Sequence, residues 1–397
     1  MTDSAGEQAP VGPTGSDRES ADLSILVFTS HRPEEVVEPL RETDLDVAVV
    51  SVDGGSLPSR VVTTVRRTRR ALAAHEPDAV LLDCYEAMGA LVTLLADRRG
   101  VPVVDRLVGD TWLRFENGIR EAKSEGEWGR AAAYRAILGV DEFVFSRASG
   151  FVVVSDQLGE VVRRRTGCPP EHIGNVPVPA PGGGTEAITG AVAETVAPTD
   201  GGDRFGIDAD RVLLTVTNLT YRAKLRGVET VLEAMLPLLE ADPDLAYVVA
   251  GGGEYAEELR ETLDDHVTDP DVRRRIRALG FVDGVADLYA LADVFVYVSY
   301  LDGYPRVVLE AQEAGLPVVA NDAFGMREQV RDGESGYLID PEETGALREA
   351  VSTLLAEPET RRRYGDRGRA RVARENAPEA VGRQLETFLR RLVAEIG

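Results

Sequence analysis

Lysine is almost missing from this chain of 397 residues. Lys123 and Lys224 are the only two, and all Lys and Arg together number 44 against 68 Asp and Glu, a formal net charge of −24. Such a charge repels nucleic acid, so no nucleic-acid partner is expected. A dispersed acidic surface with arginine in place of lysine predicts adaptation to high ionic strength, as in a halophilic archaeon. An ordinary acidic protein from a GC-rich genome is the alternative.

Cysteine and histidine are also scarce, with two and four residues. Cys84 and Cys168 form no disulfide or metal-binding pattern, and the histidines are scattered, so we expect neither a metal site nor a cofactor. No apolar run approaches the roughly 18 to 20 residues of a membrane-spanning helix. Residues 1–22 are rich in Ser, Gly, Pro and acids, which predicts a disordered acidic tail and not a secretory signal. A cytoplasmic protein is therefore expected.

Short β-rich runs alternate with amphipathic helical stretches from residue 23 onward. This alternation predicts an α/β protein with two doubly wound, Rossmann-like domains, and the length also favours two domains. A ligand site is expected between them, at the carboxyl ends of the strands. We expect domains at 23–180 and 205–375, a flexible linker or insertion at 181–204 and a terminal helix at 376–397. The expected strands are Ser24–Phe28, Val47–Val52, Ala79–Asp83, Val101–Asp105 and Phe151–Ser155 in the first half, and Arg211–Thr217, Ala246–Ala250, Val294–Ser299 and Pro317–Ala320 in the second. Pro- and Gly-rich composition from Asn175 to Asp203 is the reason for the linker.

The most informative segment follows the strand that ends at Ser299 and reads Asp302-Gly-Tyr-Pro-Arg-Val-Val-Leu-Glu310. Gly303 permits a tight turn, and Pro305 suits the first position of a helix. Free N–H groups at the start of that helix can receive phosphate oxygens. Asp302 and Glu310 can then face one ligand from different distances. An acidic helix start beside an exposed acid is the alternative interpretation.

A basic segment, Asn218 to Gly227, follows the strand that ends at Thr217. A basic loop between a strand and a helix suits a diphosphate. Lys224 is informative because a chain that has nearly abandoned lysine keeps one there; a chance surface lysine is the alternative. The next helix is expected over Val228–Leu239, with one apolar stripe.

With these residues, the chain from about Val212 to Asp340 resembles the retaining GT-B glycosyltransferases of family four, the glycosyl transferases group 1. Their Glu-x7-Glu motif corresponds here to Asp302 and Glu310, so the first acid is one methylene shorter. Arg226, and not a lysine, precedes Gly227. Further matches lie at Val249–Gly253, Gly280–Asp283, Leu288–Phe295, Ala323–Glu328 and Asp332–Leu338.

The resemblance implies a GT-B fold and a metal-independent retaining hexosyltransferase. Such an enzyme moves a sugar from a nucleotide-diphosphate sugar to a glycan or lipid-linked acceptor, here in polysaccharide biosynthesis or protein glycosylation. It implies that Glu310 binds the ribose, that Asp302 holds the donor sugar, and that Lys224 and Arg226 neutralise the leaving diphosphate. The last three are thus the expected catalytic residues. The other donor-binding residues that it implies are Gly303, Tyr304, Pro305, Arg306, Val307, Asn218, Gly252, Val282, Phe324 and Gly325. In this family the terminal helix crosses back onto the first domain.

The acceptor side is expected in the first domain, at His31, Asp110 and Trp112. Asp110 stands near the place of the family's His-Gly pair, and Trp112 is expected either to stack on a sugar or to lie in the core. A basic block runs from Arg60 to Arg70. It suits peripheral contact with an anionic membrane surface or a phosphate-bearing lipid-linked acceptor, and a solvated helix face is the alternative.

Two other functions stay open. A GT-B-type sugar-nucleotide epimerase or hydrolase would need acid and base groups in the site. A catalytically silent, nucleotide-sugar-binding partner subunit is compatible with Asp302 and the missing His-Gly pair.

Overall fold

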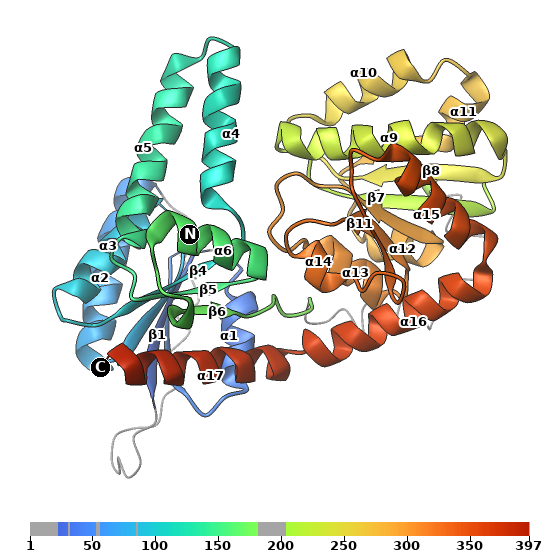
Figure 1. Ribbon diagram of the computed structural model, residues 1–397. Helices are drawn as coiled ribbons and strands as arrows, with labels where there is room; N and C mark the ends of the chain where they lie inside the picture. The colour runs from blue at the N-terminus through green and yellow to red at the C-terminus, as the bar shows by residue number, and fades with distance from the viewer. Residues whose placement is uncertain (1–22, 31, 53–55, 85, 182–203, 397) are drawn as a thin grey trace, which may run out of the picture.

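The computed structural model describes residues 23–396 except residue 31, residues 53–55, residue 85 and residues 182–203 (Figure 1). The predicted tail, His31 and nearly all of the predicted linker lie outside the described residues. Two six-stranded parallel sheets with helices on both faces form two Rossmann-like domains, as the alternating sequence pattern predicts.

The first sheet has the order β2-β1-β3-β4-β5-β6. Its central strands are buried along their whole length because helices cover both faces. The strands are β1 (Ser24–Thr29), β2 (Asp46–Ser51), β3 (Ala79–Asp83), β4 (Val103–Leu107), β5 (Gly150–Val153) and β6 (Ile173–Asn175). The helices are α1 (Glu34–Arg41), α2 (Leu57–Ala74), α3 (Glu86–Asp97), α4 (Thr111–Ser124), α5 (Trp128–Phe145) and α6 (Asp156–Thr166), with a short 3-10 turn at Pro170–His172.

The second sheet has the order β12-β11-β10-β7-β8-β9. Its strands are β7 (Arg211–Val216), β8 (Leu245–Ala250), β9 (Ile276–Gly280), β10 (Val294–Tyr297), β11 (Val318–Asn321) and β12 (Gly336–Ile339). The helices are α9 (Arg222–Ala241), α10 (Ala256–His266), α11 (Pro270–Arg275), α12 (Ala286–Leu291), α13 (Arg306–Glu313), α14 (Met326–Gln329), α15 (Thr344–Ala356), α16 (Pro358–Glu375) and α17 (Pro378–Ile396).

The last two helices join the domains. Helix α16 packs on α13 of the second domain, and α17 packs on α1 of the first (Figure 1). Leu385, Phe388 and Leu389 of α17 enter the apolar cluster beneath β1. The chain therefore ends on the domain in which it began.

Some expectations about secondary structure were wrong. Neither Phe151–Ser155 nor Pro317–Ala320 is the last strand of its half, because β6 and β12 follow them. Strands β6 and β12 are short edge strands that contain glycine, so neither shows a long apolar run. Strand β4 extends past Asp105, because Asp105 and Arg106 are buried within it. Val176 and Val178 lie in the core, so the proline-rich segment after Asn175 still belongs to the first domain.

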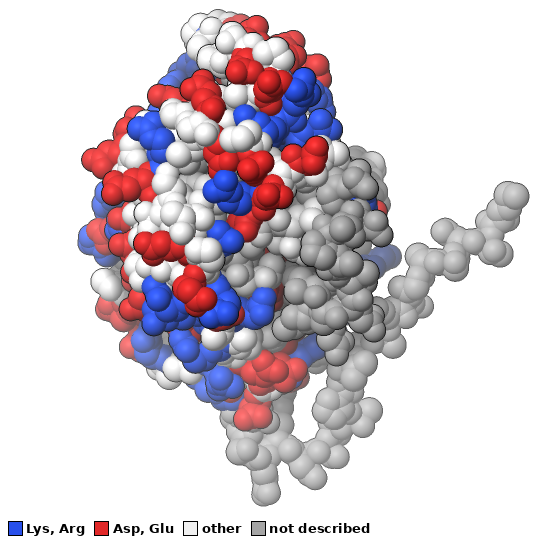
Figure 2. Space-filling model, turned by 90° about the vertical axis from the view of Figure 1, so that its right-hand side faces the viewer, with Lys and Arg blue, Asp and Glu red and all other residues white. Residues whose placement is uncertain are grey.

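The outer surface of the second domain mixes both signs of charge. Figure 2 shows Lys and Arg interspersed with Asp and Glu over this face, and many of these arginines form ion pairs, such as Arg362 with Glu359. Among the described residues, no helix is both long and apolar enough to cross a membrane.

Candidate functional site

Loops at the carboxyl ends of the two sheets meet at the domain interface. A Cβ atom added at Gly303 would overlap the Val108 carbonyl oxygen and lie 2.7 Å from the Gly109 Cα. The loop after β10 therefore touches the loop after β4, and only glycine allows this approach. Nearby, the Phe324 N–H donates to the Gln157 side chain at 2.6 Å, again across the interface. Loops of both domains thus border one region, at the carboxyl ends of the strands where such folds usually bind their ligands.

Lys224, Tyr297 and Asp302 form a buried polar cluster beside this contact. The Lys224 ammonium donates to the Tyr297 hydroxyl at 2.9 Å and to the Asp302 carboxylate, which also accepts from Tyr297. Burial alone would lower the pKa of Lys224, but Tyr297 and Asp302 outweigh it, and the pKa lies above its ordinary value. Burial would raise the pKa of Asp302, but the Lys224 ammonium holds it below its usual range. Both groups are therefore charged at neutral pH.

Lys224 and Arg226 lie in the first turns of α9, and the prediction of a basic loop ending at Gly227 was wrong. Helix α9 begins at Arg222 and not at Val228. A Cβ atom at Gly227 would overlap the Val298 carbonyl oxygen, so this glycine lets the helix start pack against the end of β10. The glycine that looked like a helix boundary thus serves close packing inside the helix.

The two predicted phosphate ligands are not brought together. Two residues along a helix correspond to a turn of about 200°, so the side chains of Lys224 and Arg226 diverge. Arg226 pairs with Glu342 at 3.1 Å and lies over the Tyr300 ring. Of these two basic residues, Lys224 alone contacts Asp302.

Glu310 lies on α13 and is oriented by a tyrosine from a neighbouring helix. Its carboxylate accepts a hydrogen bond from the Tyr289 hydroxyl of α12 at 2.9 Å. Glu313, one turn further along α13, is buried, and its Oε2 atom has no hydrogen-bond partner among the described residues. Burial and the nearby Glu310 charge raise the pKa of Glu313 to about 7. The Glu310 carboxylate, held by Tyr289, therefore lies near the Glu313 carboxyl, which titrates near neutral pH.

Arg306, the first residue of α13, bridges the two domains. Its guanidinium donates to Glu35 of α1 at 2.7 Å. Arg106 on β4 contacts the same carboxylate at 3.4 Å and also pairs with Asp83 at 2.8 Å. This chain of alternating charges runs from the start of α13 into the first sheet.

The remaining donor-side residues surround the same loops. Pro305 is the residue before α13, one position earlier than expected, so Arg306 and Val307 supply the first helical N–H groups. The Tyr304 ring is buried, and its hydroxyl accepts from Asn376 at 3.1 Å. The Gly325 N–H donates to the Gly303 carbonyl at 2.6 Å.

The loops after β7, β8 and β9 lie together at one end of the second domain. The Leu219 N–H donates to the Gly252 carbonyl at 2.9 Å, which places exposed Asn218 beside the glycine turn. Val282 packs against the core of the domain. Its neighbour Phe281 is 83% exposed and lies against Gly252. A flat aromatic surface is thus available where the resemblance had indicated Val282.

On the first domain, the two described acceptor candidates differ. Asp110 caps α4 by accepting from the Leu113 N–H at 2.8 Å, and burial raises its pKa. Trp112 is 3% exposed and packs on Phe145, with ring centroids 4.7 Å apart. Burial thus favours the core interpretation of Trp112.

Sequence reasoning missed the partners of the predicted residues. Glu35, Tyr289, Tyr297 and Glu313 each contact or neighbour a predicted group. Glu313 had a local signal, since it lies three residues after Glu310 and thus near its face of the helix. Tyr297 lies only five residues before Asp302, but an apolar strand gives no sign that its hydroxyl binds a carboxylate. Tyr289 and Glu35 lie 21 and 271 positions from their partners and had no local signal.

Two Rossmann-like domains that meet at the carboxyl ends of their strands define the GT-B class of fold. Residues 204–371 match the family described as Glycosyl transferases group 1, and residues 17–179 match the Glycosyl transferase 4-like domain. The two matches fall one on each of the two Rossmann-like domains.

Individual relatives agree with this assignment. N-acetyl-alpha-D-glucosaminyl L-malate synthase of Bacillus anthracis is 28% identical over 186 residues, 46% of each chain. D-inositol 3-phosphate glycosyltransferase of Streptomyces bingchenggensis is 26% identical over 362 residues, 87% of this chain and 75% of that protein. The chain spans about half the length of the first curated relatives that it matches. Anabaena HepE, solved in complex with UDP-glucose, has the same fold, with a TM-score of 0.65, 16% identity and coverage of 93% and 99% of the two chains.

Proposed function

We propose that the protein is a retaining glycosyltransferase that transfers a hexose-type sugar from a nucleotide-diphosphate sugar to a glycan or lipid-linked acceptor, without an obligatory metal. The observation that carries the proposal is the position of Lys224. The lysine is 6% exposed and is directed to Asp302, at the loop that opens α13. An ammonium group, paired with Asp302 when no donor is bound, therefore stands beside the loop that leads to the helix start.

The donor site is built around α13. The N–H groups of Arg306 and Val307 at its first turn, together with Lys224, form a site for a diphosphate. Glu310 offers its carboxylate, oriented by Tyr289, to the ribose hydroxyls. Phe281 adds an exposed ring beside Gly252 that suits a nucleobase.

Transfer needs charge stabilisation more than proton movement by the protein. As the bond between the anomeric carbon and the diphosphate breaks, negative charge grows on the diphosphate oxygens. Lys224 and the helix N–H groups stabilise that charge without a metal ion. In a retaining front-face reaction, the leaving phosphate itself accepts the proton of the acceptor hydroxyl. The Asp302 carboxylate would hold the sugar hydroxyls and keep Lys224 in place.

Two classes of acceptor can be compared directly. The names of two relatives include inositol 3-phosphate and L-malate, which are small anionic compounds. Our proposal of a glycan or lipid-linked acceptor therefore competes with a small anionic acceptor. Offering both classes to the enzyme with one donor separates them.

Donor binding is tested by thermal shift with a panel of nucleotide sugars in high salt. One donor should raise the melting temperature of the native protein. Lys224→Ala and Glu310→Ala should abolish that shift, whereas Arg362→Ala on the distant face of α16 should keep it. If no nucleotide sugar shifts the native protein, the proposal fails.

Product analysis separates the remaining functions. A transferase releases a nucleoside diphosphate and a new glycoside with the anomeric configuration of the donor. An epimerase would return an isomerised nucleotide sugar, a hydrolase would release free sugar, and a silent subunit would bind the donor and leave it intact. An inverted product would refute retention.

Source and location are part of the same proposal. We infer a halophilic origin from the arginine-rich basic residues and the charge of −24, and a cytoplasmic protein that takes part in polysaccharide biosynthesis or protein glycosylation. A melting temperature that rises steadily between low and molar salt is expected for the first inference, because salt screens repulsion between acids. A flat salt response would contradict it.

A further inference from the structure

Helix α2 is a basic element in an acidic protein. Its 18 residues, Leu57–Ala74, contain no Asp or Glu. They contain five arginines, at positions 60, 66, 67, 69 and 70. The chain as a whole has a net charge of −24, so the local charge of α2 is opposite to that of the molecule.

The arginines of α2 lack acidic partners. None of the five forms an ion pair within 4.0 Å with any residue that the structure describes; Arg67 donates to the Ser51 carbonyl, at 2.7 Å. The arginine cluster on α6 is different, because two of its three arginines are paired, Arg163 with Glu160 and Arg165 with Glu116. Helix α2 contains no acid that could pair in this way.

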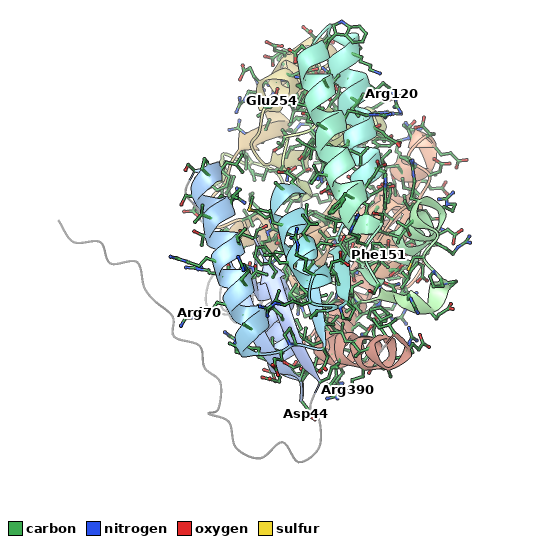
Figure 3. All side chains as sticks on the ribbon, turned by 90° about the vertical axis from the view of Figure 1, so that its left-hand side faces the viewer. Asp44, Arg70, Arg120, Phe151, Glu254 and Arg390 are labelled. Atoms are coloured by element: carbon green, nitrogen blue, oxygen red, sulfur yellow. The ribbon has the colours of Figure 1, made fainter. Side chains whose placement is uncertain are left out.

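Apolar side chains are exposed among these arginines. Val62 is 64% exposed and lies on the side of α2 opposite the buried Thr64, Thr68 and Leu72. A shallow depression is lined by Val61, Val62, Val65, Arg66 and Arg69. Figure 3 shows α2 on the outer side of the first domain, with Arg70 projecting away from the protein. An exposed valine and several arginines thus share one outward face.

We propose that α2 is a docking surface for an anionic lipid bilayer. Phosphate headgroups complement the guanidinium groups, and Val62 enters the interfacial layer, as in a basic amphipathic helix that lies on a membrane. A nucleic acid would bind the arginines but would leave the exposed Val62 without an apolar partner. Repulsion of the acidic remainder orients the molecule so that α2 faces the lipid.

The position of α2 suits a membrane-bound acceptor. The helix begins six residues after Ser51, the carboxyl end of β2, and that edge of the sheet is the one whose loops meet the second domain. The proposal does not rest on glycosyl transfer, because it concerns a surface that shares no residue with the donor site.

The test is co-sedimentation of the full chain with vesicles at low and high ionic strength. We expect binding to vesicles that contain phosphatidylglycerol and none to pure phosphatidylcholine. The variant Arg66→Gln/Arg69→Gln/Arg70→Gln should bind on the order of 100-fold more weakly at low salt, because each basic residue near the membrane surface contributes its own share of the binding free energy. Val62→Ser should also weaken binding with no change of charge.

The matched control is Arg163→Gln/Arg164→Gln/Arg165→Gln on α6, which removes the same charge and should bind like the native protein. Equal loss in both triple variants would overturn the proposal, because binding would then follow net charge alone. Competition by inorganic phosphate at millimolar concentration would also overturn it, since that indicates a local phosphate site. Glu310→Ala should still bind vesicles, which separates failure here from failure of the proposed function. Far-UV circular dichroism verifies that each variant is folded.

Discussion

Lys224 and Asp302 form a buried ion pair between the first turn of α9 and the loop that precedes α13, and Tyr297 contacts both. The two residues are separated by 78 positions in the sequence. The pair ties the segment between β10 and α13 to α9. It therefore fixes the position of the start of α13, which we assign to the diphosphate.

Removing Lys224 should destabilise the protein as well as silence it. Lys224→Ala leaves the Asp302 carboxylate with the Tyr297 hydroxyl but no cation, and loss of one partner of a buried pair costs about 3 kcal/mol or more. Urea unfolding measures this loss. The double variant Lys224→Ala/Asp302→Ala should be less destabilised than the sum of the two single variants, and simple additivity would show that the pair is not coupled.

The hydroxyl of Tyr289 should contribute to donor affinity without touching the donor. Tyr289→Phe removes one hydrogen bond to Glu310 and should weaken donor binding by about fivefold, as for one ordinary hydrogen bond. Isothermal titration calorimetry measures the change. Glu310→Ala should have a much larger effect; if the two variants are equal, orientation by Tyr289 is the whole contribution of Glu310 and our assignment of the ribose contact is wrong.

Donor affinity should fall as the pH rises through about 7, the pKa of Glu313, which burial and Glu310 raise from 4.5. Below that pH the carboxyl is neutral. Above it, a second negative charge lies near Glu310 and disfavours an anionic donor, on the order of a fivefold loss. Titrations with the donor between pH 6 and 8 test this. Glu313→Gln keeps the shape without the charge and should flatten the profile; an unchanged slope in that variant would assign the effect to another group.

Asp141 should limit stability at neutral pH. Burial raises its pKa to about 6, so the folded state holds this proton more tightly than the unfolded state does, and stability falls as the pH rises from 3.8 to about 6. Asp141→Asn keeps the acceptor for the Glu86 N–H at 2.7 Å and removes the charge. We expect a gain of about 3 kcal/mol at pH 7 and little gain at pH 3.5, measured by urea unfolding. Exposed Asp97→Asn is the matched control, and an equal gain there would contradict the burial argument.

Local patterns in the sequence predicted most of the fold. The apolar runs of β1, β3 and β8 are continuous because both faces of these strands are buried. Edge strands such as β6 and β12 are short and carry glycine, so no pattern indicated them. The turn at Gly303 and the start of α13 were predictable for a similar reason, since both depend on neighbouring residues.

Contacts between distant residues could not be predicted. Arg306 reaches Glu35 across 271 positions, and neither residue carries a local sign of the other. Gly227 is a different case, because a glycine can mark a helix boundary or permit close packing, and the sequence did not distinguish these roles. A glycine ends many helices, yet here it allows α9 to begin earlier and pack on Val298. Because α9 begins at Arg222, Lys224 and Arg226 are both helical and point in different directions. A loop had been expected there, so this divergence was not predicted.

The central claim is tested most directly by acceptor-dependent release of nucleoside diphosphate from a nucleotide sugar. The protein is incubated with the donor that stabilises it and with a glycan or lipid-linked acceptor, in buffer that contains a metal chelator. The released nucleoside diphosphate and the glycoside are then quantified. We predict equal amounts of both products with the native protein, none without acceptor, and a loss of about 100-fold or more in Lys224→Ala, as for the removal of one group that stabilises leaving-group charge. Release that needs no acceptor, or that survives in Lys224→Ala, would contradict the account.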